Sequence, residues 1–194
     1  MAKINKNLLV RGARGNMGKQ FVYRKHGKDT LMTSMPEFNE NLQPTARQVE
    51  IRDLFAEAAG YAKGVIADPE LKKEYKKKAK PGRTAYNIAF RDYLKAPVVQ
   101  SINPVQYTGL PGSKVEISAK DDFRVAAVTV SIYLPSGVLL EQGNAILNPV
   151  NRNKWIYTAT QSNNAPPGSV IKATAFDLPG NQGSLEINIP MVML

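Results

Sequence analysis

The residue types that most often do chemistry are few in this chain and poorly spaced for catalysis. Residues 13–20 contain a Gly-Lys pair, but a phosphate-binding loop needs glycine at the position of Ala13 and Ser or Thr at that of Gln20. The single histidine, His26, cannot form a two-histidine metal site or a convincing Ser-His-Asp triad. Cysteine is absent as well. We therefore expect no enzyme, no cofactor and no small-molecule substrate.

Basic side chains are the better candidates for function, as contacts to a partner or to nucleic acid. They lie in a glycine-rich N-terminal arm and in a run that holds six lysines within residues 72–80. The candidates are Arg11, Arg14, Lys19, Arg24, Lys25, Lys28, Lys72, Lys73, Lys76, Lys77 and Lys80. Lysines that neutralise phosphates release counterions and give salt-dependent affinity. The run lacks arginine forks and interleaved aromatic residues, which argues against base readout.

Each basic segment also has a second interpretation. The lysine run fits a solvated helical face whose C-terminal cations favour the helix dipole. The arm, with glycine-spaced arginines, fits a phosphate backbone and equally fits docking on a neighbouring subunit. Both alternatives stay open for the arm.

Charge divides the chain into two halves. Residues 1–96 hold 20 Lys and Arg against 10 Asp and Glu, whereas residues 97–194 hold six of each. Self-repulsion of the first half opposes folding unless an anion or a partner chain offsets it. The division predicts two domains, a basic anchoring or assembly unit over 1–96 and a neutral domain over 97–194.

Turn and helix signals predict a small α+β unit in the first half. Residues 19–36 read as a β-hairpin in which Phe21, Tyr23 and Leu31 alternate with polar residues. Three short helices should follow. Thr45, Asp68 and Thr84 are their expected N-caps, and an apolar stripe from Ile51 to about Ile66 marks the first. The third should stop before Pro97.

From Pro97 onward, apolar residues recur every two residues, as in a β-strand, instead of every 3.6 residues, as in a helix. Seven strands are expected, at 98–107, 114–119, 125–134, 138–147, 154–160, 169–176 and 184–193. Turn sequences such as Pro135-Ser136-Gly137 separate them. Seven short strands at this spacing predict an all-β immunoglobulin-like sandwich, whose core would hold the aromatic residues Phe123, Trp155, Tyr157 and Phe176.

The second half resembles bacterial immunoglobulin-like domains. The resemblance rests on Ala119-Lys120-Asp121-Asp122-Phe123, on Trp155-Ile156-Tyr157-Thr158-Ala159 and on Ala175-Phe176-Asp177-Leu178-Pro179-Gly180-Asn181. Such domains occur in adhesins, surface fibres and phage virion decoration proteins, and the resemblance implies a binding or spacing module. The whole chain also resembles a family of similarly sized, uncharacterised bacterial or phage-type proteins, through its glycine-rich basic start and a helical middle containing Tyr61-Ala62-Lys63.

One weak metal hypothesis concerns Asp121, Asp122 and Asp177. In an immunoglobulin topology the loops that carry them emerge at the same end, where three carboxylates could hold calcium. The competing interpretation is that Asp177 and Asn181 cap a turn through local hydrogen bonds.

These observations together favour a non-enzymatic structural protein that forms homo-oligomers or a larger assembly, such as a virion-associated or filament component. The alternative is a sequence-nonspecific nucleic-acid-binding protein that uses the basic half. Neither a membrane span nor a Sec-type signal peptide is expected, because no apolar stretch is long enough. We expect a cytoplasmic protein or an assembled particle.

Overall fold

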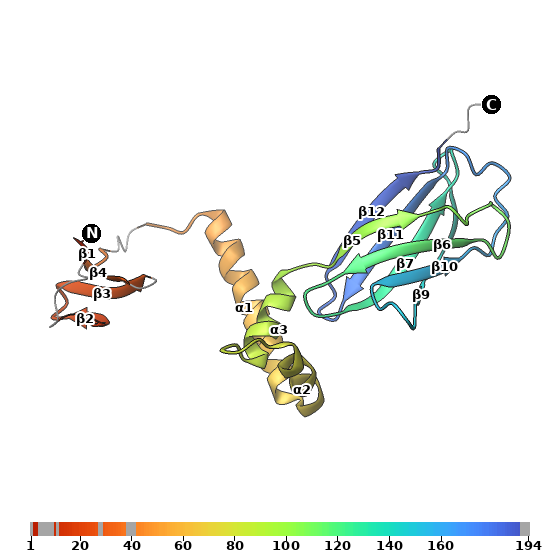
Figure 1. Ribbon diagram of the computed structural model, residues 1–194. Helices are drawn as coiled ribbons and strands as arrows, with labels where there is room; N and C mark the ends of the chain where they lie inside the picture. Colours follow the sequence, from red (N-terminus) through yellow and green to blue (C-terminus); the bar gives the residue numbers. More distant parts are fainter. Residues whose placement is uncertain (1, 4–9, 11, 27–28, 38–41, 191–194) are drawn as a thin grey trace. The chain divides into compact units, whose positions relative to one another are not determined.

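The computed structural model describes residues 2–3, 10, 12–26, 29–37 and 42–190 (Figure 1). The chain divides into two compact units, Met1–Gln48 and Val49–Leu194. This division differs from the boundary expected at 96/97. The helices belong to the same unit as the sheets that follow them, because helices and sheets share buried side chains. Charge segregation therefore does not coincide with the compact units.

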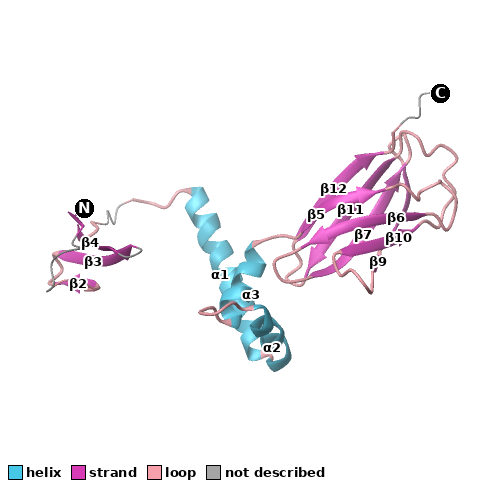
Figure 2. Cartoon of the chain, viewed as in Figure 1, coloured by secondary structure: helices cyan, strands magenta, loops and turns pink. Residues whose placement is uncertain are grey.

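The first unit is a four-stranded antiparallel sheet in the order β1-β4-β3-β2 (Figure 1), and Figure 2 shows strands in magenta. Its strands are β1 (Ala2–Lys3), β2 (Gly15–Met17), β3 (Phe21–His26) and β4 (Asp29–Ser34). The expected hairpin is present as β3 and β4. Strands β1 and β2 are too short to give a period, so sequence did not predict them.

The register of this sheet gathers apolar side chains on one face. Directly paired residues share a face, and Met17 pairs with Phe21 while Tyr23 pairs with Met32. Because Phe21 and Tyr23 are two residues apart, all four lie on the same face. Leu31 pairs with Arg24 and lies on the other face, which corrects the expected alternation.

Three helices follow, at the places where sequence predicts them: α1 (Ala46–Ala67), α2 (Pro69–Lys78) and α3 (Ala85–Leu94). All three expected caps are formed. Thr45 and Gln48 make a reciprocal capping box at 3.0 and 3.3 Å. The Asp68 carboxylate accepts from the first amides of α2, and the Thr84 hydroxyl accepts from the Asn87 amide.

The apolar stripe of α1 is only partly covered. Ala58, Ala62 and Val65 are buried, as the helical period predicts. In the N-terminal half of the helix, Ile51 and Phe55 are exposed instead. The expectation of one continuous buried stripe was therefore wrong for the first three turns.

The rest of the chain forms two four-stranded antiparallel sheets, in the orders β5-β6-β10-β9 and β12-β11-β7-β8. Their strands are β5 (Val98–Asn103), β6 (Lys114–Lys120), β7 (Val125–Tyr133), β8 (Leu139–Asn144), β9 (Ile146–Leu147), β10 (Lys154–Thr158), β11 (Val170–Asp177) and β12 (Gln182–Asn188). The candidate strand at 138–147 is divided, because β8 pairs with β7 whereas β9 pairs with β10. Residues 191–193 of the last candidate lie outside the described part of the chain.

The two sheets enclose one apolar core. Buried residues alternate with half-exposed ones along β6, β7 and β11, so each strand contributes every second side chain. Val115, Val130 and Ala173 are fully buried in this core, and Trp155 and Tyr157 join it as expected. Burial of each valine side chain contributes about 1.5–3 kcal/mol.

A second core joins the helices to the end of the two sheets. Phe123, from the β6–β7 loop, stacks on Tyr75 of α2 with ring centroids 3.8 Å apart. Leu178, after β11, packs against the same helical cluster. The expectation that Phe123 belongs to the core between the sheets was therefore wrong, and it instead fixes the sheets to α2.

Candidate functional site

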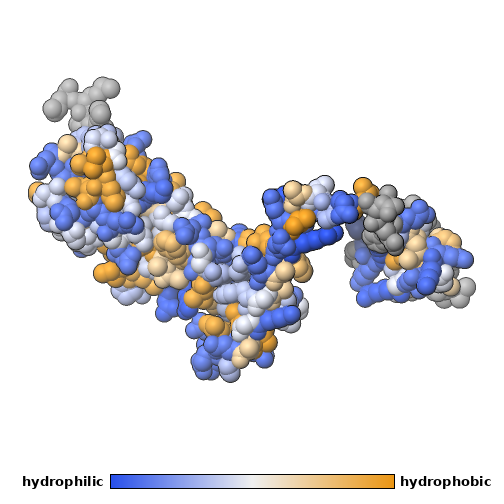
Figure 3. All heavy atoms as spheres, turned by 180° about the vertical axis from the view of Figure 1, so that it is seen from behind, coloured by the Kyte–Doolittle hydropathy of each residue, from blue (hydrophilic) through white to orange (hydrophobic). Residues whose placement is uncertain are grey.

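The lysines of α2 surround the one buried side chain of that helix, Tyr75. Because 3.6 residues make a turn, Lys72 and Lys76 lie on one face. Lys73 lies on a different face and lines none of the hollows described below. Figure 3 shows hydrophilic and apolar side chains intermixed over the surface of the helices.

The first hollow, here called the helical pocket, has a volume of about 560 Å³. Cations from three segments line it: Lys63 of α1, Lys72 and Lys76 of α2, and Arg83 of the α2–α3 connection. Ile66, Thr84, Ala85 and Tyr86 complete the lining. No carboxylate lines this pocket, so its potential is positive.

Two further hollows are connected to the helical pocket through shared lining residues, the second directly and the third through the second. The second, of about 290 Å³, is lined by Lys78, Lys80, Arg83 and Arg91 together with Ile88, Asp92, Asp122 and Phe123. The third, of about 530 Å³, combines Lys77 and Lys78 with Lys120 of β6, Arg124 of the β6–β7 loop and Arg152 of the β9–β10 loop. It also includes Glu74 and Asp121. Arg83 belongs to the first and second hollows, and Lys78 to the second and third. The three hollows therefore adjoin, and we call them together the cationic surface.

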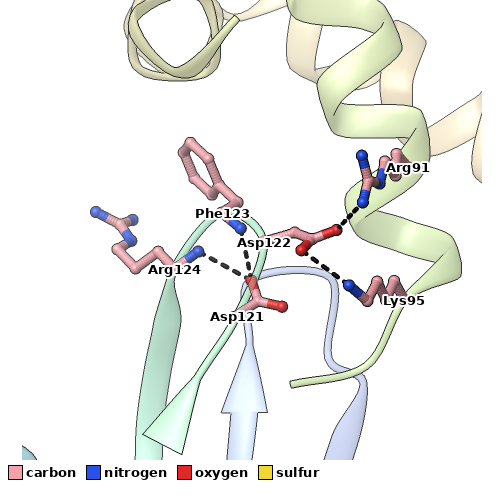
Figure 4. Close-up of polar contacts among 6 residues, drawn as sticks. All are labelled: Arg91, Lys95, Asp121, Asp122, Phe123 and Arg124. Atoms are coloured by element: carbon pink, nitrogen blue, oxygen red, sulfur yellow. Dashed lines mark hydrogen bonds and ion pairs between the residues drawn. The ribbon is translucent and has the colours of Figure 1, made fainter. Parts of the chain in front are cut away.

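The ion pairs of the described residues leave the helical pocket uncompensated. Asp122 binds Arg91 at 2.8 Å and Lys95 at 2.9 Å (Figure 4). Both cations lower the pKa of Asp122, the Lys95 hydrogen bond most strongly. Arg124 lies 3.4 Å from Glu74. These pairs neutralise carboxylates of the second and third hollows, while the four cations of the helical pocket have no ion-pair partner in the described part of the chain.

The cationic residues expected in the N-terminal arm belong to the first unit. Arg14, Lys19, Arg24 and Lys25 are exposed. Lys19 has a φ of 57°, and its amide donates to the Asn16 side chain at 2.8 Å, which fixes the turn before β3. Two other candidates, Arg11 and Lys28, lie outside the described residues.

Beneath the cationic surface, a buried carboxylate joins α3 to α2. Asp92 of α3 is 1% exposed, and its Oδ2 accepts a hydrogen bond of 2.6 Å from the Tyr75 hydroxyl. The hydroxyls of Tyr75 and Tyr61 are 2.8 Å apart, so Tyr61 donates to Tyr75. Burial raises the pKa of Asp92 to about 7, and the charges of Asp121 and Asp177 add to this effect.

The three carboxylates of the calcium hypothesis are occupied by other bonds. Asp121 accepts from the Phe123 and Arg124 amides at 3.0 and 2.9 Å, and Asp122 turns toward the helix to bind its two cations (Figure 4). Asp177 accepts from the amide and side chain of Asn181, so the turn-capping interpretation describes it. Among the described residues, no group of three or more His, Cys, Asp or Glu could hold a metal ion.

Asn181 also ties the β11–β12 turn to the end of α3. Its side-chain amide donates to the backbone carbonyls of Asp92 and Tyr93 at 3.3 and 3.1 Å. These bonds satisfy carbonyl groups that a helix C-terminus leaves without a partner. The loops at this end of the sheets thus hold the helices by stacking, ion pairs and hydrogen bonds.

The segment that resembles a phosphate-binding loop takes another conformation. Its residues Gly15–Met17 form β2, and the strand β3 follows instead of the helix that such a loop requires. His26 is exposed at the end of β3.

Sequence reasoning missed six cations of these hollows, because isolated cations give no local signal: Lys63, Arg83, Arg91, Lys120, Arg124 and Arg152. It also left out Lys78, although this residue lies in the predicted lysine run. Asp92 did carry a signal. It follows Ala85 and Ala89 at helical spacing, on the buried face of α3. A carboxylate at such a position indicates a buried polar network.

No helix in the described part of the chain is long and apolar enough to cross a membrane. Searches against protein-family models and against curated protein sequences found no match. Among solved structures, CopC from Methylosinus trichosporium OB3b is 15% identical with a TM-score of 0.35, over 50% of this chain and 97% of its own. An engineered protein is 14% identical with a TM-score of 0.35, over 59% of this chain and 29% of its own. The chain thus spans nearly all of the first structure and under a third of the second.

Proposed function

We propose that this chain is a non-enzymatic structural protein. Residues 1–48 attach it to neighbouring copies in a homo-oligomer or larger assembly, and residues 97–194 form an immunoglobulin-like sandwich that serves as a spacer or interaction domain. A virion-associated component and a filament subunit are the settings in which such a division of labour is useful.

The observation that carries the proposal is that the apolar face of the first unit's sheet is not covered by other described residues. Thr30 is the one buried residue among the described residues of this unit, whereas Met17 is 60% exposed and Phe21 41%. A sheet needs a second layer to bury its apolar face, and a few strands alone are marginally stable in water. A neighbouring subunit would supply that layer.

Two further features support self-association. The exposed stretch of α1 that contains Ile51 and Phe55 offers apolar area next to the sheet in sequence. The first unit is also basic, with no acidic residue before Asp29. Burial of apolar side chains between copies would offset the electrostatic repulsion between their basic residues.

Strand order supports the immunoglobulin-like assignment. In that fold, strands A, B, E and D form one sheet and C, F and G the other, with an added C′ strand in some members. The order β5-β6-β10-β9 corresponds to ABED, and β12-β11-β7-β8 corresponds to GFCC′. This fold hosts many unrelated functions, so the function depends on the surfaces of the protein and not on the fold.

The test is the oligomeric state of the full chain by size-exclusion chromatography with light scattering, over a range of concentrations. We expect a concentration-dependent oligomer that the double variant Met17→Ser/Phe21→Ser reduces to monomer. The control is Val150→Ser, which removes an apolar side chain 93% exposed in the second unit. A monodisperse monomer at high concentration, or equal association of both variants, would refute the proposal. The 260/280 nm ratio of the peak shows separately whether nucleic acid accompanies the particle.

A further inference from the structure

The cationic surface has properties that subunit attachment does not require. Residues 63–95 carry ten Lys or Arg side chains against four Asp or Glu. The structure arranges much of this charge in three adjoining hollows and adds Lys120, Arg124 and Arg152 from the sheets and their loops. Lysines that only keep a helix solvated would be spread around it, because separated cations repel one another less than cations gathered in one hollow. The gathering of cations in hollows therefore indicates a binding role.

Adjoining hollows fit a charged polymer better than a single small anion. A single anion would occupy one hollow and leave the others uncompensated. A chain with a regular anionic repeat can pass from the helical pocket across the position of Arg83 to the second hollow, and across Lys78 to the third. Each contact replaces condensed counterions on the polymer, which favours binding at low salt.

The lining of the helical pocket indicates which polymer. Tyr86, Ile66 and Ala85 give it an apolar and aromatic wall beside the four cations. A cationic groove with an aromatic side chain is the arrangement that binds single-stranded nucleic acid, because bases stack on the ring while phosphates contact the cations. Tyr86 is half-buried, with its ring centroid 6.1 Å from that of Phe90, so part of the ring is free to stack on a base. An acidic polypeptide would use only the cations.

We propose that the cationic surface binds single-stranded nucleic acid without sequence preference. Lys63, Lys72, Lys76 and Arg83 contact phosphates in the helical pocket, and Tyr86 stacks on a base. The remaining cations extend the track along the backbone. This site lies in the second unit and does not depend on the attachment function proposed for residues 1–48.

The experiment uses the full chain and a fluorescently labelled 20-nucleotide oligo(dT), with binding followed by anisotropy as salt is raised. For five neutralised phosphates, the slope of log K against log salt is about −3.5 for a single strand, or about a 100-fold loss of affinity between 50 and 200 mM salt. An affinity that does not change with salt would overturn the proposal.

Matched variants locate the site. Lys72→Gln/Lys76→Gln should weaken binding about tenfold and reduce the slope by about 1.4. Lys73→Gln/Lys114→Gln removes the same charge from exposed positions outside the three hollows and should change binding less than threefold. Equal effects of the two double variants would show unspecific attraction to net charge and would overturn the assignment to this surface. Circular dichroism confirms that each variant keeps its helices.

Two measurements separate nucleic acid from an acidic polypeptide. Tyr86→Leu keeps an apolar side chain but removes the ring, and should weaken oligo(dT) binding about tenfold at constant salt slope. Poly-glutamate of equal charge should compete at least tenfold less well than unlabelled oligo(dT). Unchanged binding by Tyr86→Leu together with equal competition would mean that the surface recognises acidic polymers in general, and the nucleic-acid proposal would then be wrong.

Discussion

Replacing the buried carboxylate Asp92 with asparagine should change how stability depends on pH. In the native protein Asp92 is 1% exposed, and its Oδ1 has no hydrogen-bond partner in the described part of the chain. The Oδ1 of Asp121 is buried and without a partner as well. Burial raises the pKa of Asp92 most strongly, and the nearby charges of Asp121 and Asp177 raise it further.

The sign follows from where the proton is held. The pKa of Asp92 is about 7 in the folded protein and 3.8 in the unfolded chain, so between these values the folded state binds more protons. The free energy of unfolding therefore falls as pH rises from about 4 to 7. Above pH 7 this contribution of Asp92 no longer changes with pH. The pKa difference corresponds to about 4 kcal/mol in total, and to about 2–3 kcal/mol between pH 5 and pH 8.

An asparagine at this position is neutral at every pH. Its oxygen can accept from the Tyr75 hydroxyl, and its amide can donate to Asp121. We expect Asp92→Asn to be close to the native protein in stability at pH 5 and about 2–3 kcal/mol more stable at pH 8. Urea unfolding measures the free energy of unfolding at each pH. It can be followed by the fluorescence of the single tryptophan, Trp155, and by circular dichroism of the helices.

The neighbouring Asp122 provides the control. Asp122→Asn is the same chemical change, but the pKa of Asp122 is lowered and that of Asp92 is raised, so the two variants should shift the pH dependence of stability in opposite directions. Lys95 and Arg91 lower the pKa of Asp122, so its contribution is present at neutral pH and is lost as pH falls through the folded-state value. Asp122→Asn should therefore destabilise the protein at pH 8 and have a smaller effect in acid. Parallel stability curves for native protein and Asp92→Asn between pH 5 and 8 would refute the reasoning about Asp92.

Four further changes test the packing of glycines, a helix cap and a buried hydrogen bond. A Cβ at Gly183 would lie 1.8 Å from the Pro97 carbonyl oxygen, so Gly183→Ala should lower the free energy of unfolding by about 3 kcal/mol. Gly60 lies in open space on α1, so Gly60→Ala should instead raise the free energy of unfolding by about 0.5–1 kcal/mol. Asp68→Ala removes the cap of α2 and should cost about 1 kcal/mol, measured as a lower urea midpoint. Tyr75→Phe removes the donor to Asp92 and should cost about 1–3 kcal/mol at pH 8; a neutral result would contradict the role given to this hydrogen bond.

Local signals were sufficient for most elements of the second unit. The caps at Asp68 and Thr84 depend on side chains two or three residues from the amides that they bind, so short-range sequence predicts them. Alternation along β6, β7 and β11 likewise follows from the two-residue period of a strand. Strands β1 and β2 gave no such signal, because they are too short to show a period.

The sequence by itself determined where the helices and most strands lie, since capping, turn chemistry and apolar period act within a few residues. Only the tertiary structure decided which side chains meet. It placed Phe123 against Tyr75, buried Asp92 beside Asp121, and brought Arg83 and Arg152 to the same cationic surface as the lysines of α2. Such contacts join residues far apart in the chain, and their energies depend on burial and on neighbouring charge, which exist only once the helices and sheets have packed.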